Sequence, residues 1–410
     1  MPQNLTEASG ILKDFHLPMA REQLVNKTVA LAEIEKNDDD VEATGEGAEL
    51  VLSLHVRRNT AVGAREDGGT VPTPGNQKYV KQRVPLRTPL TARIRLSLQV
   101  MAAMATNRGA WERAATSETK RVVNDGRRDV NRQLHGTSDG TIATTAASAA
   151  STTVTLATAT TAVAMRQFEV GMLLDISSAA TPGNAAVAAS REITSVNRTA
   201  KTFVITGAAV ATSAGDRVER QGSGGSGATQ KEATGLQTII DSTGTLFGVD
   251  PTVYDSWSSF EDATGGAPSE NLFEKAMDEI DINGAGESTG EFLVLTTHGV
   301  MRGYSNQLTT LKRMPSTLVL KGGFKALEIS SGSGMGALAA DRDTPTGVAY
   351  FIDRGHWWLA QWNEPEWLDD GAVLRQVPDK LQVEATLYWI AEQVVDSRNA
   401  HAKLTGLTES

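Results

Sequence analysis

The feature that most constrains this chain is a pair of β-type segments separated by a stretch with almost nothing to bury. Residues 50–56 are rich in Leu and Val, and residues 78–86 alternate apolar and polar side chains with a period of two. The stretch 63–76 between them is dense in Gly, Pro and charge, so we expect it to be mobile in an isolated subunit. Because a two-stranded ribbon alone is only marginally stable in water, the hairpin predicts a chain that needs a partner surface.

The composition is that of a folded protein, and it excludes several classes of function. With 410 residues, of which 40% are hydrophobic and 21% charged, the chain is long enough for two or more domains. The net charge of −10 disfavours a dedicated nucleic-acid binder, unless the basic residues gather on one face. Cysteine is absent, which excludes disulfides, thiolate metal sites and a cysteine nucleophile.

The hydropathy pattern gives no sign of membrane insertion or export. No apolar run approaches the roughly 20 residues that a membrane-spanning helix needs, so we expect no membrane partner. Residues 1–15 are too polar and acidic for a signal peptide. We therefore expect the chain to be made and folded in the cytoplasm.

Changes in composition and pattern divide the chain into six segments. They are predicted as an N-terminal arm (1–45), an extended hairpin loop (46–90), a long helix (91–136), an inserted β domain (137–225), a mixed α/β segment (226–345) and a set of return strands (346–410). The arm has too few apolar residues to fold alone, and we expect it to be extended and ordered only by neighbours. The glycine-serine stretch 222–227 has the composition of a flexible linker.

The segment 91–136 has the pattern of one long amphipathic helix. Its apolar residues, such as Met101, Met104, Trp111 and Val122, recur at helical spacings. The segment is also strongly basic, through Arg108, Arg113, Lys120, Arg121, Arg127, Arg128 and Arg132. A solvated helix face explains these charges. The alternative is a surface that faces DNA phosphates, which attract cations whatever the base sequence.

Strand and helix patterns alternate through the rest of the chain. Short strands rich in β-branched residues, typical of a small β-barrel or sandwich, are predicted at 153–156, 168–176, 192–196 and 202–206. A helix is predicted over 271–280, with Ser269 as its N-cap. Further strands are predicted at 292–296, 348–352 and 383–391.

Few residues could carry chemistry. The six histidines share no metal-ligand spacing, and no glycine cluster is followed by the Lys-Ser/Thr pair of a phosphate-binding loop. The group Asp341-Arg342-Asp343 is predicted to be a charged turn rather than an acid–base pair or a cation site. We predict no catalytic residue, no metal and no cofactor, although the sequence leaves a dispersed catalytic triad open.

Tryptophans and acidic residues gather late in the chain. Trp357, Trp358, Trp362 and Trp367 lie close to Glu364, Glu366, Asp369 and Asp370 in the sequence. This strip fits a sugar-binding surface, and it fits a buried core or a subunit interface equally well.

The order of these elements resembles the major capsid proteins of tailed bacteriophages, which have the Hong Kong 97-type fold. Three strings also look like members of that family: 65–77 (REDGGTVPTPGNQ), 312–327 (KRMPSTLVLKGGFKAL) and 396–402 (DSRNAHA). The resemblance implies an α+β fold with an N-terminal arm, an extended loop, a peripheral domain with a long spine helix, and an axial domain. The inserted β domain, a small barrel or sandwich, departs from the minimal family pattern.

The resemblance also implies roles for particular segments. Residues 46–90 would lie over a neighbouring subunit, and 226–345 would meet its copies around hexamer and pentamer centres. The residues implied in contacts between subunits are Arg65, Glu66, Asp67, Lys78 and Lys81. The helix residues that would face DNA are Arg113, Lys120, Arg121, Arg127 and Arg128. Some relatives join the loop to a neighbour by a Lys–Asn isopeptide bond, but no partner asparagine aligns here, so we predict no crosslink.

We therefore predict a structural subunit, not an enzyme, that assembles into hexamers and pentamers of an icosahedral phage head around double-stranded DNA. Its location would be the virion, after assembly in the cytoplasm of a host bacterium. Its predicted partners are further copies of itself, a portal, a decoration protein and non-specific DNA. Some relatives carry a scaffolding segment ahead of the arm, whereas this chain starts almost directly with the arm, so we also expect a separate scaffolding protein.

Two alternatives of other classes stay open. The first is a phage decoration or tail binding module that works through the inserted β domain. The second is a hydrolase that uses the strip 357–370, with Glu366 and Asp369 as the residues to change.

Overall fold

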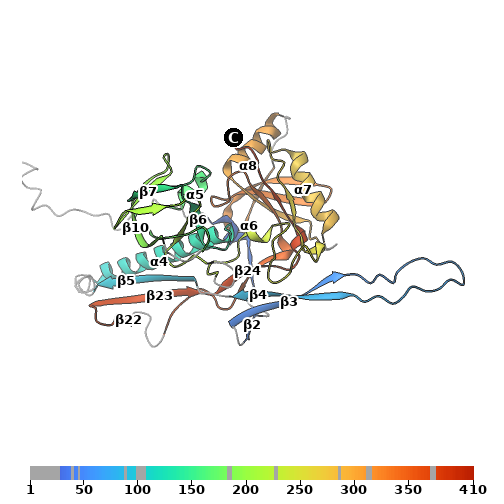
Figure 1. The fold of residues 1–410 in the computed structure, drawn as a ribbon, viewed down its shortest axis with the longest axis horizontal. Helices are drawn as coiled ribbons and strands as arrows, with labels where there is room; N and C mark the ends of the chain where they lie inside the picture. The colour runs from blue at the N-terminus through green and yellow to red at the C-terminus, as the bar shows by residue number, and fades with distance from the viewer. Residues whose placement is uncertain are drawn as a thin grey trace, which may run out of the picture.

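The computed structural model describes residues 28–37, 41–44, 47–86, 90–97, 108–181, 187–225, 230–284, 288–310, 316–369 and 375–410. Predictions on most of the arm (1–27), on Met101 and Met104, and on the first residues of the 312–327 string lie outside these ranges. The described helices are α2 (Val29–Glu33), α4 (Arg108–Leu134), α5 (Ala162–Arg166), α6 (Leu236–Ile239), α7 (Glu270–Asn283) and α8 (His298–Thr310). Figure 1 shows a body of sheets and helices from which one hairpin projects.

A seven-stranded sheet, here called the central sheet, organises the later part of the chain. Its strands are, in spatial order, β14 (Phe260–Asp262), β25 (His401–Leu404), β19 (Ala349–Asp353), β15 (Glu291–Thr296), β18 (Gly334–Ala340), β17 (Lys325–Ser331) and β16 (Thr317–Val319). β15 runs parallel to β18 and antiparallel to β19. Every residue of β19 and β25 is buried, because both faces of the sheet are covered.

Helices α7 and α8 cover one face of the central sheet. They pack on it through Phe273, Met277 and Tyr304, which are almost fully buried. Ser269 Oγ accepts a hydrogen bond from the Leu272 N–H at 3.3 Å, which satisfies one of the free donors at the start of α7. The predicted helix over 271–280 and its N-cap are therefore confirmed.

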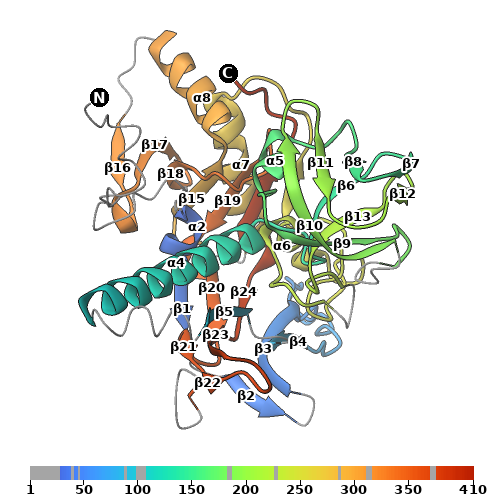
Figure 2. The same cartoon turned by 90° about the vertical axis from the view of Figure 1, so that its left-hand side faces the viewer.

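The opposite face of the central sheet joins the end of α4. Leu293 and Ile352 of the sheet lie in one buried cluster with Leu134 of α4 and with Trp357. Burial of these side chains contributes roughly 1.5–3 kcal/mol each, so this cluster is a main source of stability. Figure 2 shows α4 running alongside α2, with its C-terminal end beside the β-rich segment that follows.

Three smaller sheets lie below the central sheet in Figure 2. The first contains β1 (Glu35–Asn37), β20 (Trp357–Gln361) and β24 (Ala391–Val395). The second contains β2 (Val41–Thr44), β3 (Gly47–Arg57) and β4 (Lys78–Leu86). The third contains β21 (Glu366–Trp367), β23 (Gln382–Trp389), β22 (Arg375–Gln376) and β5 (Leu90–Ser97).

The helix predicted over 91–136 is shorter than the sequence suggested. Leu90–Ser97 forms strand β5, which pairs antiparallel with β23 from Leu90 opposite Trp389 to Ser97 opposite Gln382. The helix itself, α4, begins at Arg108. Residues 90–97 alternate apolar and polar residues with a period of two, which is the pattern of a strand. They form a strand because β23 supplies a pairing partner. The strand predicted over 383–391 is likewise two strands, since β23 ends at Trp389 and β24 begins at Ala391.

Residues 141–220 form a β-rich segment with its own core, here called the β unit. Its strands are β6 (Thr141–Thr144), β7 (Ser148–Ser151), β8 (Thr153–Thr155), β9 (Leu173–Ser177), β10 (Ala188–Asn197), β11 (Thr202–Ile205), β12 (Val210–Thr212) and β13 (Arg217–Arg220). Six of them form one sheet, and β7 pairs with β12. The buried members of its hydrophobic cluster all lie between Ala143 and Val218, and Phe168 stacks on Phe203 with ring centroids 5.2 Å apart. Of the strand predicted over 168–176, only the part from Leu173 forms.

Two predictions of flexible or partner-ordered chain need correction. Part of the arm is ordered on its own subunit, because Val29 and Ala30 are buried against the main core and β1 pairs with β20. The described part of the glycine-serine linker is also held in place. The Gly222 N–H donates to Asp175 Oδ2 at 2.7 Å, and the Gly225 N–H donates to the Asp139 carbonyl at 3.1 Å.

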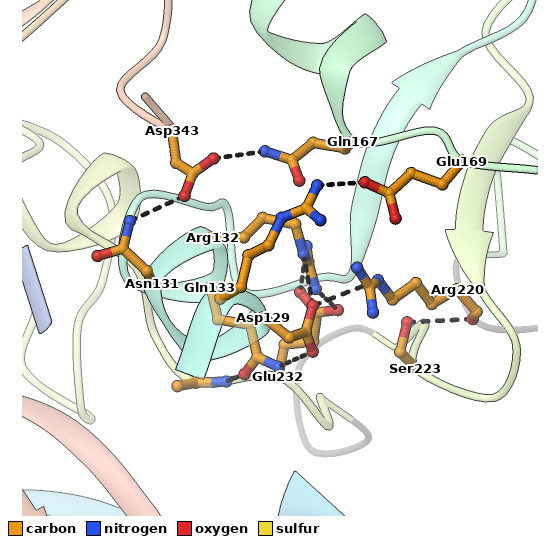
Figure 3. A network of polar contacts seen from close by, with 12 residues as sticks. Asp129, Asn131, Arg132, Gln133, Gln167, Glu169, Arg220, Ser223, Glu232 and Asp343 are labelled. Atoms are coloured by element: carbon orange, nitrogen blue, oxygen red, sulfur yellow. Dashed lines mark hydrogen bonds and ion pairs between the residues drawn. The ribbon is translucent and has the colours of Figure 1, made fainter. Parts of the chain in front are cut away.

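A buried ion-pair network, here called the junction, joins α4 to the β unit and to the segment after it (Figure 3). Arg132 pairs with Glu232 at 2.5 Å and with Asp129 at 2.9 Å, and Arg220 of the β unit pairs with Asp129 at 3.2 Å. Burial would raise the pKa of Asp129, but Arg132 and Arg220 outweigh it and hold that pKa at about 2. Arg132 is therefore the central cation of a buried set of carboxylates.

The junction continues into the loop after β18. Asn131 Nδ2 donates to Asp341 Oδ1 at 3.1 Å and to Asp343 Oδ2 at 2.8 Å, and Gln167 of the β unit donates to Asp343 Oδ1 at 2.7 Å. The Ala30 N–H donates to Asp341 Oδ2 at 3.0 Å. The predicted charged turn 341–343 is therefore a buried anchor for three segments, and its carboxylates are stable inside because donors from distant elements satisfy them.

The closing string 396–402 contributes a second buried cation. Arg398 is fully buried and donates from Nε to the Ile239 carbonyl at 2.7 Å and from Nη2 to the Thr238 carbonyl at 3.1 Å. A third donor, Nη1, reaches the Gly244 carbonyl at 2.5 Å. The end of α6 and the loop after it are therefore fixed to the central sheet.

We expect Arg132→Ala to lower the free energy of unfolding by roughly 3–5 kcal/mol, because it leaves the buried carboxylate of Glu232 unpaired and removes one of the two cations that pair with Asp129. Urea unfolding of the purified chain, followed by tryptophan fluorescence, measures this loss. Arg127→Ala, at an exposed position on the same helix, is the matched control and should stay within about 0.5 kcal/mol. A loss below 1 kcal/mol for Arg132→Ala would contradict the structural role of the junction.

Acid should weaken the junction through Asp341. Burial would raise the pKa of Asp341, but His135 and the donated hydrogen bonds hold it at about 2, below the ordinary value of 3.8. A lowered pKa adds stability that is complete above the unfolded value and is lost as the pH falls from about 4 to about 2. We expect Asp341 to account for about 2 kcal/mol of that loss in urea unfolding between pH 5 and pH 2. Asp341→Asn should show a shallower acid dependence than the exposed control Asp369→Asn, and equal slopes would refute the assignment.

Candidate assembly interface

The hairpin predicted from the sequence is present, and its base is anchored in the body. β3 and β4 pair antiparallel from Ala48 opposite Leu86 to Arg57 opposite Lys78. Near the base, Leu50 and Val84 are buried in a small apolar cluster with Val394. The strand predictions for 50–56 and 78–86 are therefore confirmed.

Polar contacts fix the direction in which the hairpin leaves the body. Gln82 is fully buried, and its Nε2 donates to the Val395 carbonyl at 2.8 Å. The Arg83 N–H donates to the Phe247 carbonyl at 3.1 Å. Lys78 Nζ lies 4.9 Å from the centroid of the Tyr254 ring, a cation–π contact at the other end of the β3–β4 ladder, where the outer part of the hairpin begins. The hairpin is thus a directed projection, as Figure 1 shows.

The outer part of the hairpin, residues 58–77, exposes apolar side chains. Val62 is 85% exposed and Val71 is 79% exposed. The tip keeps a local shape, because Arg65 Nε donates to the Thr70 carbonyl at 3.2 Å and the Gly69 N–H donates to the Glu66 carbonyl at 3.0 Å. A projection with this much exposed apolar surface has the properties of a contact surface for another molecule.

The five predicted loop residues lie on this one hairpin, but they do not form one cluster. Arg65, Glu66 and Asp67 are exposed at the tip, whereas Lys78 lies at the start of β4. Lys81 is exposed on β4 opposite Ser53. They therefore mark the two ends of a long surface.

The predicted DNA-facing residues of α4 have different surroundings. Lys120 and Arg127 are exposed, and Arg121 is partly exposed. Arg113 lies on α4, but its side chain is outside the described residues. Arg128 is buried and pairs with Glu169 of the β unit at 2.5 Å. Its assignment to a DNA-facing surface is therefore wrong, because its charge is neutralised inside the subunit.

The tryptophan strip is divided between the core and a surface groove. Trp357 is buried in the main core, while Trp362 is 44% exposed. Trp367 and Trp389 line a groove of about 520 Å³ that also borders α2 and α4. Lys36 Nζ lies 5.2 Å from the centroid of the Trp389 ring. The sequence did not predict this groove, because its walls come from segments that are far apart in the chain.

One acidic residue of the strip, Glu366, is engaged in a structural contact. Glu366 accepts a hydrogen bond from the Tyr388 hydroxyl, and this bond raises the pKa of Tyr388. Within the described residues, no group of three His, Asp or Glu side chains could hold a metal ion. The described helices include none that combines the length and apolar character needed to cross a membrane.

Comparison with known proteins identifies the fold. Neither the known protein-family models nor the curated proteins give a match to this chain. A subunit in the capsid of cyanophage A-1(L) aligns with 99% of this chain and 100% of its own, with a TM-score of 0.59 and 10% identity. A capsid chain of the native GTA particle aligns over the full length of both chains, with a TM-score of 0.50 and 11% identity. At these identities the likeness concerns the fold, and we conclude that this chain has the fold of phage-type capsid subunits.

Proposed function

We propose that this chain is the major capsid protein of a tailed bacteriophage, with the Hong Kong 97-type arrangement of arm, loop, peripheral domain and axial domain. Many copies would form hexamers and pentamers of an icosahedral head around double-stranded DNA, without enzymatic activity. The agreement in fold over the whole chain with capsid subunits supports the proposal. The decisive feature within the subunit is the projecting hairpin, because its exposed valines need a surface that one subunit does not offer.

The shape of the subunit suits contacts between different surfaces of neighbouring copies. The hairpin leaves one side of the body, and we propose that its apolar surface contacts a different patch on the neighbour. Such heterologous contacts generate closed rings when the rotation between copies closes. We propose that 226–345 lies toward the ring centres and that 46–90 lies over the adjacent copy.

Partners other than the chain itself follow from the proposed role. DNA would meet the exposed cations Lys120 and Arg127 of α4 through a salt-dependent attraction. Loss of salt-dependent DNA binding in the double variant Lys120→Gln/Arg127→Gln would support that surface, and unchanged binding would exclude it. A separate scaffolding protein, a portal and a decoration protein complete the proposed set. Shells of uniform size from this chain alone would argue against the scaffold.

The proposal is tested by electron microscopy of the purified chain together with light scattering. We expect closed shells, rings of five or six copies, or curved sheets. If the chain alone stays small, it is co-expressed with the neighbouring head genes of its phage, which supply the proposed scaffold. A monodisperse monomer or trimer under both conditions would contradict the capsid role and would favour a binding module that works through the β unit.

Removing the apolar surface of the hairpin should stop assembly without unfolding the subunit. We expect Val62→Ser/Val71→Ser to raise the concentration needed for assembly at least about tenfold, because each buried valine contributes roughly 1.5 kcal/mol or more. Light scattering measures assembly, and circular dichroism checks the fold.

The matched control is Val170→Ser/Leu173→Ser, which removes exposed apolar side chains from the β unit. This control should assemble like the unchanged chain. If the control fails to assemble and the hairpin variant succeeds, the proposed role belongs to the β unit and not to the hairpin.

A further inference from the structure

A basic cleft lies between the β unit and the central sheet, away from the hairpin and the groove described above. Its volume is about 480 Å³. It opens where the parallel strands β15 and β18 end, since Thr297 and Asp341, the residues that follow them, both line it. In α/β sheets, the region beyond the carboxyl ends of parallel strands is a common place for ligands.

Cationic side chains from both parts of the subunit converge on this cleft. The β unit supplies Arg166, at the end of α5, with Arg198 and Lys201 from the turn between β10 and β11. The central-sheet part supplies Arg302 of α8 and Arg342 from the loop after β18. Five cations in one cleft are unusual for a chain whose net charge is −10.

Neutral backbone acceptors hold three of these side chains in place. Lys201 Nζ donates to the Thr158 carbonyl at 2.5 Å, Arg198 Nη2 donates to the Phe168 carbonyl at 3.3 Å, and Arg342 Nη2 donates to the Arg166 carbonyl at 3.2 Å. A carbonyl acceptor fixes the position of a cationic side chain but does not neutralise its positive charge. The cleft is therefore preorganised as well as positive.

The positive charges of the cleft are only partly compensated. In the ranges that the structure describes, Arg166, Arg198, Lys201 and Arg302 form no ion pair with a carboxylate. Burial lowers the pKa of Arg342, the nearby Arg128 and Arg166 lower it further, and the carboxylates of Asp343 and Glu169 only partly oppose this shift. The carboxylate of Asp341 also borders the cleft, but the junction already engages it. Several cations therefore lie close together in this cleft, although they repel one another.

The chain itself places one carboxylate beside these cations. Thr297 caps α8, because its Oγ1 accepts a hydrogen bond from the Val300 N–H at 3.3 Å. The Thr297 hydroxyl in turn donates to Glu409 Oε1 at 2.6 Å, and the Gly347 N–H donates to the same oxygen at 3.1 Å. A carboxylate therefore already lies at the positive end of α8, which is evidence that an anion is stable at this position.

We propose that this cleft binds a phosphate-bearing anion that bridges the β unit and the central sheet. Two carboxylates, those of Asp341 and Glu409, line the cleft with five cations, so the remaining positive charge matches a ligand with several anionic oxygens. Arginine guanidinium groups suit such oxygens, because each can donate two parallel hydrogen bonds to one phosphate. The volume exceeds that of one phosphate group, and it fits a compact polyphosphate or the backbone phosphates of a nucleic-acid strand at its rim.

The test is calorimetric titration of the full purified chain with inorganic tripolyphosphate at constant ionic strength. The site lies within one subunit, so the result does not depend on whether shells form. We expect saturable binding of one ligand per chain. The variant Arg166→Gln/Arg302→Gln removes one exposed cation from each side of the cleft and should weaken binding at least about tenfold.

The control Lys325→Gln/Lys380→Gln removes the same charge from exposed positions outside the cleft and should bind like the unchanged chain. Competition with a short DNA duplex then separates the two phosphate sources. Displacement of tripolyphosphate by the duplex assigns the site to nucleic acid, and failure to displace it assigns the site to a small polyphosphate. Absent binding, or equal weakening in the cleft and control variants, overturns the proposal.

Discussion

The structure depends on a buried polar junction at the C-terminal end of α4. Asp129, Asn131 and Arg132 occupy one helical turn, and they reach the β unit, the segment after it, and the loop at 341–343. Burial of so many charges carries a large desolvation cost, which only complete pairing can offset. In return, the junction fixes an orientation. Apolar packing tolerates small rotations between two parts of a protein, whereas the hydrogen bonds and ion pairs of the junction are all satisfied in only one relative orientation. In the proposed shell such a fixed orientation would matter, because an error between the parts of one subunit would be repeated in every copy.

The body and the hairpin differ in how far their side chains are buried and satisfied. Within the body, the central sheet is covered on both faces, and even Arg398 is satisfied by three backbone carbonyls. The hairpin leaves Val62, Val71 and Tyr79 exposed while its base is locked by Gln82 and Val84. A rigid base fixes the direction of the projection, and the apolar tip then supplies contact area with little loss of orientational entropy. This division would allow one chain to fold by itself and still present a surface for the proposed assembly.

Local patterns were sufficient for elements whose own side-chain pattern or cap indicates the structure that forms. The hairpin strands, the helix after Ser269 and the strands at 202–206 and 292–296 all follow from periodicity and capping. The prediction failed where a distant segment decided the outcome. Residues 90–97 became a strand because β23 lies beside them, although it is almost 300 residues away along the chain. Arg128 and Arg132 were grouped with the surface cations, because their partners Glu169 and Glu232 are far away in the sequence and no local pattern indicates these pairs.

The proposed contacts of this acidic chain with anions depend on an uneven distribution of its basic residues. Its basic residues are not spread evenly: some are consumed inside the junction, some remain on the exposed side of α4, and five converge on the cleft beyond β15 and β18. Net charge sets the long-range field, which falls off within a Debye length of about 8 Å at physiological salt, so short-range recognition depends on local groupings. In the proposed assembly, copies of this chain would repel one another only weakly at a distance, and the local positive surfaces would act at short range. For the proposed anion binding, the local distribution of charge therefore matters more than the net charge.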